Sequence, residues 1–572
     1  MTGKSNLFMK FSSLGEALRD ACERFAGRVA LIEADREEER QRWTYRQARE
    51  EAERFAANLQ AKKFAPEDRC AIVMSNQGKW LLSAMGVFWA GGVLVPLDFK
   101  LGPQDWLRLI RHSEPKVLVV EWQFWRQILE AGRLPQDFPK TFVTEAPAGA
   151  ELGGAWRWEE GAGENFQYRD RRPEDVAAIV YSSGTGGAMK GCMLTHANYL
   201  SQLEQFHLRT GLGSEDRYFS FLPTNHAIDF VFGFLYPLNV GAQVVHQRTL
   251  RPQYLLPTFK KYRITAASMV PMLLAMLKSR LEEKLTALPA SKRLALRGLV
   301  AINRGLTKSP RHWISKRLLA KIHDEFGGCL RLIMTGGAFV EPGLARFFYD
   351  LGFFVGIGYG LTEAGTAVSA PTWGRYSSDN VGRVLHLTRV RIENPDERGV
   401  GEIWVKGPSV MKGYWKDPGL TAETLVDGWL RTGDLGILEG GDTLKIVGRI
   451  KNMIVTEGGK NIYPEDVERH FAGLQECEEF CVFSKSYLWP DQPLGRDQLL
   501  MVLRPKESVQ NGRVPAALMT WNRGIPPYQR VSSYLLWSEE FPRTASLKLK
   551  RQNLADSIRS RCKVQDVKEL RP

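Results

Sequence analysis

Short apolar runs alternate with helix-forming segments through the first part of the chain. The runs typical of buried strands are residues 70–74, 93–97 and 116–121, and the intervening segments typical of helices are residues 80–89 and 104–112. Parallel strands need a crossover of this length between them, and helices on both faces leave such strands buried throughout. The pattern therefore predicts an α/β fold with a parallel sheet covered on both faces.

Three helices have recognisable starts. Ser13 with Glu16, and Thr44 with Gln47, match the capping box, in which a hydroxyl accepts a hydrogen bond from the first turn of the helix. Thr195 is the expected N-cap of a later helix. These residues predict helix starts directly after each cap.

A loop of small residues follows the next apolar run, residues 176–180. It is Y-S-S-G-T-G-G-A-M-K-G, residues 181–191. Glycines let backbone N–H groups turn toward an anion, and Thr185, the serines and Lys190 add hydroxyl donors and charge. A Walker loop is excluded, because that loop has glycine before its lysine and Ser or Thr after it. The stretch is either a different phosphate loop or a flexible turn without a ligand.

Composition limits the classes of ligand and partner. The 572 residues suggest several domains, and the net charge of +14 favours anionic ligands or surfaces. Seven scattered cysteines without a C-x-x-C pair indicate free thiols and no zinc site. We find no apolar signal segment in the first residues and no apolar run near the ~20 residues of a membrane span. A cytoplasmic protein is expected.

Residues 278–321 form a basic segment with twelve Lys or Arg and two acids, interleaved with leucines. One interpretation is a solvated helical insertion. The other is peripheral contact with an anionic membrane surface. The segment lacks the interleaved aromatic residues of a nucleic-acid platform, so no nucleic-acid partner is expected.

The C-terminal part of the chain carries further loops with chemical groups. Y-G-L-T-E-A-G, residues 359–365, follows an apolar run and offers an aromatic ring, a hydroxyl and a carboxylate, which suit a purine, a phosphate and Mg²⁺. Beyond it the sequence alternates as antiparallel strands do, and a smaller α+β segment follows Lys451. We therefore predict two domains, residues 1–450 and 451–572.

Seven motifs resemble, in the same order, the signatures of adenylate-forming enzymes, which include acyl-CoA synthetases, peptide-synthetase adenylation domains and beetle luciferases. They are Y-S-S-G-T-G-G-A-M-K-G, L-P-T-N-H, Y-G-L-T-E, G-E-I-W-V-K-G, W-L-R-T-G-D, G-R-I-K-N and P-R-T-A-S-L-K. The resemblance implies a large N-terminal domain of parallel-rich βαβ sheets plus a distorted β-barrel, and a small mobile α+β C-terminal lid domain.

The chain looks most like long-chain or medium-chain fatty acyl-CoA synthetases. Such enzymes convert a carboxylate and ATP into an acyl adenylate and pyrophosphate, and coenzyme A then takes the acyl group and releases AMP. The resemblance thus implies ATP, Mg²⁺ and coenzyme A as cofactors and a fatty acid as substrate. A homodimer is a further expectation.

The resemblance assigns phosphate and metal contacts to several residues. The β- and γ-phosphates would lie against Ser182, Ser183, Gly184, Thr185, Gly186, Gly187 and Lys190. Glu363, together with the Thr185 hydroxyl, would hold Mg²⁺, and Thr362 would touch the α-phosphate.

The adenosine contacts are assigned in the same way. Tyr359 and the adjoining Gly360 would stack on adenine, with the opposite wall formed by Gly336, Gly337 and Ala338. Asp434 would accept both ribose hydroxyls with Arg449 nearby.

The remaining assignments concern catalysis and motion. Lys548 would bridge the carboxylate and α-phosphate oxygens, and His226 would sit at the carboxylate end of the acyl pocket. Lys451 would be the hinge of the lid domain, and the Gly458-Gly459 loop would border the pantetheine channel. Each residue also has a structural alternative, such as a core tyrosine, a turn aspartate or a solvated lysine.

The sequence departs from the family at three positions. Gly186 stands where threonine is usual, Met189 where proline is usual, and Leu547 where glycine is usual. Losing one hydroxyl and gaining backbone freedom would weaken the grip on the pyrophosphate end by about 1 kcal/mol per contact. A weakly catalytic acyl- or nucleotide-binding protein is therefore a second hypothesis.

The residues after His226 bear on the substrate. Amino-acid-activating domains usually carry an aspartate near the start of the pocket segment. Just after His226 this chain has Ala227, with Asp229 two residues further, which argues against an amino acid. The apolar residues that suit an alkyl chain are Ile228, Phe230, Val231, Phe232 and Phe234. Residues 449–468 lack the insertion typical of ligases that serve carrier proteins, which favours CoA. An aryl or other carboxylate:CoA ligase and an acyl-carrier-protein ligase remain alternatives.

Overall fold

The computed structural model describes most of the chain, in two compact units. The described residues are 7–132, 134–161, 166–183, 189–306, 312–372, 378–456, 460–492, 498–506, 509, 512–543 and 549–570. One unit comprises Met1–Val390 and Val405–Leu430, and the other comprises Arg391–Trp404 and Arg431–Pro572. We predicted that a mobile lid domain begins after residue 450, and this boundary stays a prediction.

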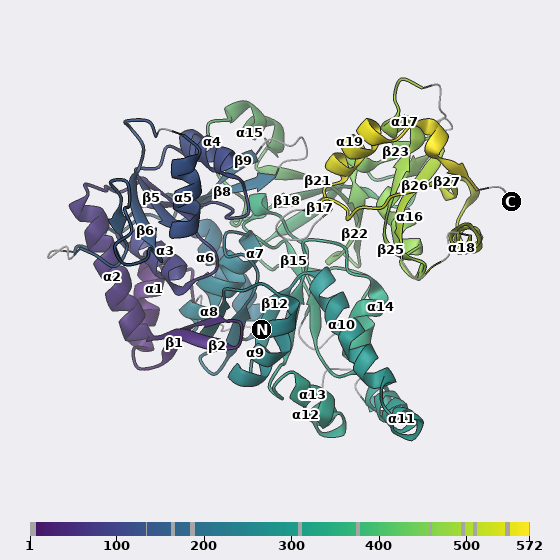
Figure 1. Ribbon diagram of the computed structural model, residues 1–572, viewed down its shortest axis with the longest axis horizontal. Helices are drawn as coiled ribbons and strands as arrows, with labels where there is room; N and C mark the ends of the chain where they lie inside the picture. Colours follow the sequence, from purple (N-terminus) through teal and green to yellow (C-terminus); the bar gives the residue numbers. More distant parts are fainter. Residues whose placement is uncertain are drawn as a thin grey trace. The chain divides into compact units, whose positions relative to one another are not determined.

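The predicted parallel sheet is present in the first unit (Figure 1). Its strands, in spatial order, are β19 (Gly413–Tyr414), β9 (Met189–Thr195), β8 (Val176–Ser183), β4 (Val93–Pro96), β3 (Arg69–Val73), β5 (Val117–Glu121), β6 (Lys140–Thr144) and β7 (Trp156–Arg157). The pairs from β8 to β7 are parallel. The helices that separate these strands along the chain include α3 (Gly78–Trp89), α4 (Pro103–Ser113) and α5 (Trp122–Glu130). Strands β4 and β5 are buried along their whole length, as a covered parallel sheet requires.

A second sheet in this unit carries the elements that line the candidate site. Its order is β14 (Val355–Ile357), β13 (Leu332–Thr335), β12 (Ala266–Met269), β10 (Arg217–Ser220), β11 (Gln243–Gln247), β1 (Val29–Asp35) and β2 (Glu38–Thr44). All pairs are parallel except β1 with β2. The carboxyl ends of β12, β13 and β14 therefore lie at one edge, where ligands bind in open parallel sheets.

The three predicted helix caps are confirmed. Ser13 caps α1 (Leu14–Arg24), and a complete capping box of Thr44 and Gln47 starts α2 (Tyr45–Ala61). Thr195 caps α6 (His196–Thr210). Between α6 and β12 the chain forms α7 (Ala227–Asp229), the π-helix η1 (Phe230–Leu235), α8 (Tyr236–Asn239), η2 (Pro252–Tyr254) and α9 (Leu255–Tyr262).

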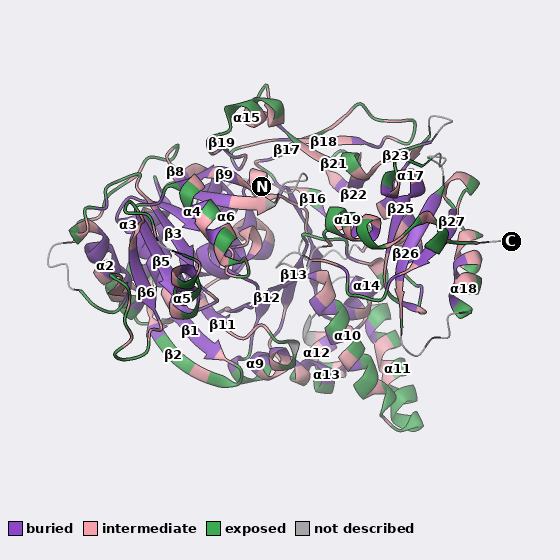
Figure 2. Ribbon diagram, turned by 45° about the horizontal axis from the view of Figure 1, so that its top comes forward, coloured by how far each residue is buried: buried purple, intermediate pink, exposed green. Residues whose placement is uncertain are grey.

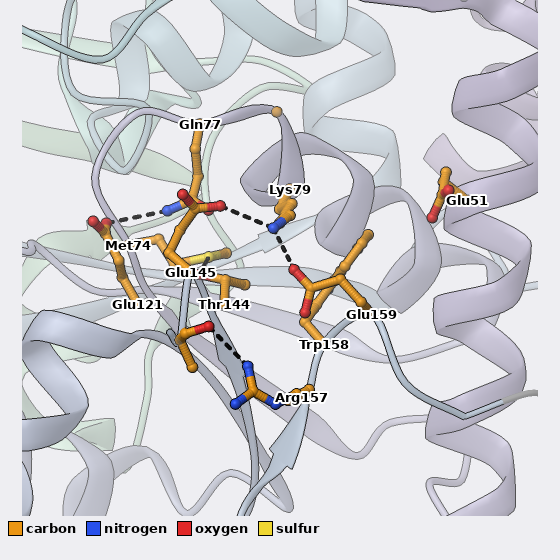
Figure 3. A network of polar contacts seen from close by, with 12 residues as sticks. Glu51, Met74, Gln77, Lys79, Glu121, Thr144, Glu145, Arg157, Trp158 and Glu159 are labelled. Carbon is orange, nitrogen blue, oxygen red and sulfur yellow. Dashed lines mark hydrogen bonds and ion pairs between the residues drawn. The ribbon is translucent and has the colours of Figure 1, made fainter. Parts of the chain in front are cut away.

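A buried network of ion pairs joins the two sheets. Arg248, which follows β11, lies 3.1 Å from Glu33 of β1, 3.2 Å from Glu121 of β5 and 3.1 Å from Glu145 after β6. Lys79 of α3 contacts the second oxygen of Glu145 at 2.8 Å. Figure 3 shows Lys79 between Glu145 and Glu159, and the Gln77 amide donating to the Glu121 carboxylate. Because each charged group has a partner of opposite charge, the network can be buried and can hold one sheet in place against the other.

The described residues of the basic segment are largely helical. Its elements are α10 (Pro271–Thr286), α11 (Ala290–Leu306), α12 (His312–Leu318) and α13 (Ala320–Glu325), followed after β13 by α14 (Pro342–Asp350). Figure 2 shows much of α11 exposed. Within the described residues, no helix has the length and apolar character needed to cross a membrane.

The rest of the chain is rich in strands and ends in a small α+β segment built on one sheet. Short elements between residues 362 and 449 are η3 (Thr362–Ala364), β15 (Ser369–Ala370), β16 (Arg383–Val384), β17 (Arg389–Glu393), β18 (Gly401–Lys406), α15 (Pro418–Thr424), β20 (Leu425–Val426), β21 (Trp429–Glu439) and β22 (Thr443–Arg449). Those that follow are η4 (Ile450–Asn452), β23 (Ile454–Val455), β24 (Asn461–Ile462), α16 (Pro464–His470), β25 (Cys477–Ser484), α17 (Lys485–Leu488), β26 (Leu499–Pro505), α18 (Arg513–Asn522), η5 (Pro527–Gln529), β27 (Val531–Leu536), α19 (Arg551–Arg561), η6 (Val564–Asp566) and β28 (Lys568–Glu569).

Strand β26 shows why the last sheet is covered on both faces. Met501 and Leu503 pack in a core with α16 and α18, whereas Leu500 and Val502 pack in a core with α19. Alternate side chains of a strand point to opposite faces, so one apolar run supplies both cores. The smaller α+β segment expected after Lys451 is thus present.

Candidate functional site

A cavity opens at the carboxyl edge of β12, β13 and β14. One part of its wall is backbone, from the turn after β13 at Gly336 and Gly337 and from Gly358 to Gly360 after β14. Tyr359 lies in this wall. The structure therefore brings together most of the residues predicted to enclose adenine, although Ala338 does not line the cavity.

The other part of the cavity wall is largely apolar. Its side chains come from α6, α7, η1, β12, β13 and the loop before β15, and they are Phe206, Ile228, Phe232, Met269, Met334 and Ala367. Ile228 and Phe232 are four residues apart and thus share a face of the helical turn. Of the apolar residues predicted to suit an alkyl chain, these two line the cavity, whereas Phe230, Val231 and Phe234 are core residues.

Two glycines of the motifs are required by close backbone contacts. A Cβ atom at Gly360 would come within 1.9 Å of the Thr366 carbonyl oxygen. A Cβ at Gly336 would come within 2.6 Å of the Gly358 carbonyl oxygen. The glycines therefore let two loops pass each other at the edge of the cavity.

Thr366 is a cavity residue that sequence reasoning missed. Its φ of +133° is rare for a β-branched residue, and such strain gathers at functional sites. Its hydroxyl donates to the Ala227 carbonyl at 3.2 Å. This bond joins the Y-G-L-T-E loop to α7, so the backbone wall and the apolar wall are held together.

The predicted phosphate loop is the tip of a β-hairpin. β8 continues to Ser183 and returns as β9 from Met189, with Ser182 opposite Lys190. We expected the loop to span residues 181–191, but residues 181–183 and 189–191 are paired as antiparallel strands, which satisfies their backbone groups. The residues at the tip that carry predicted phosphate contacts, Gly184, Thr185, Gly186 and Gly187, lie outside the described residues.

The predicted metal ligand Glu363 lies beside this hairpin. The Ser182 hydroxyl is 3.4 Å from Glu363 Oε1, and the Tyr414 hydroxyl donates to the same oxygen at 3.1 Å. Lys190 Nζ lies 5.4 Å from the centre of the Tyr414 ring. Thr362 occupies the same short helix as Glu363. The structure thus joins the hairpin, the Y-G-L-T-E loop and β19 around one carboxylate.

Sequence reasoning also missed Tyr414. It sits on the two-residue strand β19, which pairs with β9 at Tyr414 and Cys192. Burial is the main cause that raises the pKa of Tyr414, and the Glu363 charge adds to it. The phenol thus stays neutral and can donate to the carboxylate.

The site residues fit Mg²⁺. Mg²⁺ in phosphate-binding sites takes one or two carboxylates, with phosphate oxygens and water completing its shell. Glu363 supplies one carboxylate, and the described residues contain no group of three or more His, Cys, Asp or Glu that could form a protein-only metal site. One carboxylate among hydroxyls suits a metal that arrives with a nucleotide.

His226 lies close to the cavity without lining it. Its Nε2 atom is 3.9 Å from Asp98 Oδ2 and has no hydrogen-bond partner among the described residues. Burial lowers the pKa of His226, and the Asp98 charge opposes that shift. His226 is two residues before the cavity residue Ile228, and its place at the carboxylate end of the acyl pocket stays a prediction.

Asp434 and Arg449, the predicted ribose contacts, are paired in the second unit. They are opposite each other on β21 and β22, and Arg449 Nε lies 2.7 Å from Asp434 Oδ1. The Thr432 hydroxyl accepts from the Asp434 amide at 3.0 Å. The guanidinium holds the carboxylate in one orientation.

The predicted hinge and catalytic lysines lie in the same unit. Lys451 is in the short helix η4. Gly458, Gly459 and Lys548 lie outside the described residues. On either side of the Lys548 segment, Arg543 and Leu549 form an antiparallel bridge.

Comparisons with known proteins point to one family. Residues 18–415 match the AMP-binding enzyme family. The chain is 28% identical over 521 residues to a feruloyl-CoA synthase from Amycolatopsis sp., covering 88% of this chain and 92% of that protein. It is 26% identical over 551 residues to a chloroplastic long-chain-fatty-acid–[acyl-carrier-protein] ligase from Arabidopsis thaliana, covering 83% and 75%. It is 29% identical over 486 residues to human long-chain-fatty-acid–CoA ligase 1, covering 77% and 68%.

Solved structures show the same fold. An anthranilate CoA ligase in complex with anthranoyl-AMP has a TM-score of 0.78 at 18% identity, covering 96% of this chain and 97% of that one. A benzoate CoA ligase from Burkholderia xenovorans has a TM-score of 0.75 at 20% identity, covering 95% and 99%. The α/β fold class and the resemblance to adenylate-forming enzymes are thereby confirmed. The chain belongs to the AMP-binding enzyme family.

Proposed function

We propose that the protein activates a fatty acid or related apolar carboxylate with ATP and transfers the acyl group from acyl-AMP to coenzyme A. Its class, an AMP-forming acid–thiol ligase, follows from the family. The choice of a fatty acid rests on the resemblance stated above. The choice of coenzyme A rests on the uninterrupted residues 449–468.

One observation supports this proposal most strongly. A single cavity has a backbone wall with a tyrosine, suited to a purine, and an apolar wall, suited to an acyl group. An acyl adenylate carries both groups on one phosphate. We expect adenine against Tyr359 and Gly336, and the acyl group against Ile228 and Phe232.

In this proposal, residues of the chain neutralise negative charge and orient the reacting groups during adenylation. Two anions must approach, so cations are needed where negative charge develops. Glu363 would hold Mg²⁺, which neutralises phosphate charge when bound. Ser182 and Tyr414 orient that carboxylate, Lys190 would contact the phosphates, and Lys548 would bridge the reacting oxygens.

Three alternatives keep specific support. The feruloyl-CoA synthase relative favours an aryl acid, and the plant relative favours an acyl-carrier-protein acceptor. A weakly catalytic binding protein is favoured by Gly186 and Met189 in the phosphate loop. The presence of Glu363 and Lys548 argues for catalysis.

The proposed role of Lys548 gives a test that separates the two half reactions. Lys548→Ala should abolish formation of acyl-AMP from ATP and acid, measured as pyrophosphate release, while supplied acyl-AMP still reacts with coenzyme A. Lys550→Ala is the matched control, because Lys550 is exposed two residues along the chain. Equal loss of both half reactions in Lys548→Ala would contradict the role.

We also propose that α11 contacts an anionic membrane surface. Leu294 and Ile302 are 72% and 52% exposed, and the helix contains four Lys or Arg and no acid. An exposed apolar face beside cations is typical of helices that lie on anionic lipid. Sedimentation with phosphatidylglycerol vesicles should be lost in Leu294→Ser/Ile302→Ser and in high salt, but kept in the control Met9→Ser. Binding that salt and the double variant leave unchanged would contradict the proposal.

A further inference from the structure

Two phenylalanine rings close the apolar part of the cavity. Phe206 of α6 and Phe232 of η1 both line it, and their ring centres are 4.1 Å apart. Both side chains are buried. The pair therefore forms a packed wall, because rings at this separation leave no space for a chain to pass between them.

A third ring stands behind the pair. The Tyr236 ring centre is 6.4 Å from that of Phe206 and 6.5 Å from that of Phe232. Its hydroxyl is hydrogen-bonded to the Thr210 hydroxyl at 2.9 Å, which fixes the ring, and it does not line the cavity. Phe8 packs on its far side, with ring centres 6.5 Å apart. The wall is thus several buried side chains deep.

The β12 side of the cavity presents a hydroxyl group at Ser268 beside the apolar side chain of Met269. Ser268 lines the cavity, and its hydroxyl is 2.6 Å from the Tyr218 hydroxyl. Both side chains are buried, and burial raises the pKa of Tyr218, so the pair stays neutral. An alkyl chain that extended here would meet fixed polar groups, whereas a compact group stops short of them.

We propose that the Phe206–Phe232 pair sets the length limit of the acyl group, so that the enzyme accepts short-chain, medium-chain or ring-containing acids and discriminates against long straight chains. This inference rests on the proposed function and narrows its substrate class. A long chain would have to displace two buried rings and the tyrosine behind them. Overfilling a packed interior in this way is unfavourable.

The test compares chain-length profiles of the full-length protein and three variants. Phe206→Leu and Phe232→Leu each replace one ring of the pair with a smaller apolar side chain, with little loss of packing. Phe234→Leu is the matched control, because Phe234 lies on the same π-helix, is equally buried, and packs on Trp80 and Phe230 rather than on the cavity. The measurement is kcat/KM for pyrophosphate release with butyrate, octanoate, dodecanoate, palmitate and benzoate.

Wild type should favour octanoate or benzoate over palmitate by about tenfold or more, which corresponds to about 1.4 kcal/mol. Phe206→Leu and Phe232→Leu should raise the dodecanoate-to-octanoate ratio by about tenfold, and Phe234→Leu should leave it unchanged. The inference is overturned if wild type favours palmitate, if the two variants leave the ratio unchanged, or if Phe234→Leu moves it equally.

A separate readout keeps this inference distinct from the proposed function. If no acid supports pyrophosphate release, the proposed function fails. The length limit is then tested by binding. Octanoyl and palmitoyl sulfamoyl-adenosine mimic acyl-AMP without reacting, and the measurement compares how much each raises the melting temperature of the protein. Greater stabilisation by the octanoyl compound supports the ring-pair limit, and equal or greater stabilisation by the palmitoyl compound overturns it.

Discussion

The Tyr414 hydroxyl donates a hydrogen bond to Glu363 Oε1 over 3.1 Å, although the two residues are 51 positions apart in the chain. The Ser182 hydroxyl lies 3.4 Å from the same oxygen. The predicted metal ligand is thus held between β19 and β8. Its orientation depends on strand pairing far from its own motif.

We expect Tyr414→Phe to reduce kcat/KM for acyl-AMP formation by roughly 10- to 100-fold, because a hydrogen bond to a charged group contributes about 1.5–3 kcal/mol. The apparent affinity for Mg²⁺ with ATP should fall with it. The measurement is pyrophosphate release as a function of Mg²⁺ concentration.

A double-mutant cycle with Glu363→Gln separates this effect from a general loss of packing. If Tyr414 acts through the carboxylate, Tyr414→Phe has little further effect once Glu363 is changed. Additive losses would show that the tyrosine does not act through Glu363.

Asp434→Asn should weaken ATP binding by roughly 10- to 100-fold, since it removes a charged acceptor worth about 1.5–3 kcal/mol and leaves Arg449 without its 2.7 Å partner. Calorimetric titration with ATP measures the change. Glu439→Gln, at an exposed position of the same strand, should leave the affinity unaltered. An unchanged Kd in Asp434→Asn would remove Asp434 from the nucleotide site.

The Asp229 carboxyl gives a pH signature. Burial raises the pKa of Asp229 to about 7, although Ser220 and Thr224 donate hydrogen bonds to it. The unfolded chain releases this proton near a pKa of about 3.9, so from about pH 4 to 7 only the folded state holds it. Its contribution to stability is complete below pH 4, is lost as the pH rises to 7, and then levels off.

Asp229→Asn should therefore gain stability relative to wild type by about 4 kcal/mol between pH 4 and 7, as measured by urea unfolding. His246 and Tyr218 are the other titratable groups near Asp229. Burial lowers the pKa of His246 to about 3 and raises that of Tyr218, so both titrate outside this window. A stability difference that does not vary with pH would contradict the raised pKa.

The features that could be predicted from the sequence depend on contacts between residues that are close together in the chain. Ser13, Thr44 and Thr195 were identified as caps because a cap bonds within its own helical turn. Gly360 and Tyr359 belong to a contiguous motif at the end of one strand, so their shared place at the cavity was also predictable.

The missed residues depend on contacts between distant segments. Tyr414 reaches Glu363 only through the pairing of β19 with β9, and Phe206 meets Phe232 only when α6 packs on the π-helix. Thr366 is distinguished by its positive φ, which arises where its loop bonds to Ala227. A single sequence without an alignment carries no local signal for such contacts.

Arg248→Met should lower the free energy of unfolding by about 3–5 kcal/mol, because it removes the nearest cation from the buried carboxylates of Glu33 and Glu121, although Arg40 remains 3.9 Å from Glu33. Urea unfolding measures the loss. Arg126→Met is the control, since its ion pair with Glu130 is exposed and is expected to contribute less than about 1 kcal/mol. Similar small losses in both variants would show that the network does not hold the two sheets together.

The most direct test of the central claim is AMP release by the purified protein with ATP, Mg²⁺ and coenzyme A over a series of acids from acetate to stearate, with benzoate included. The account predicts AMP formation that requires both the acid and coenzyme A and reaches its maximum with one group of acids. The absence of AMP formation with every acid, together with tight binding of ATP or acyl-AMP, would contradict it and favour a binding protein.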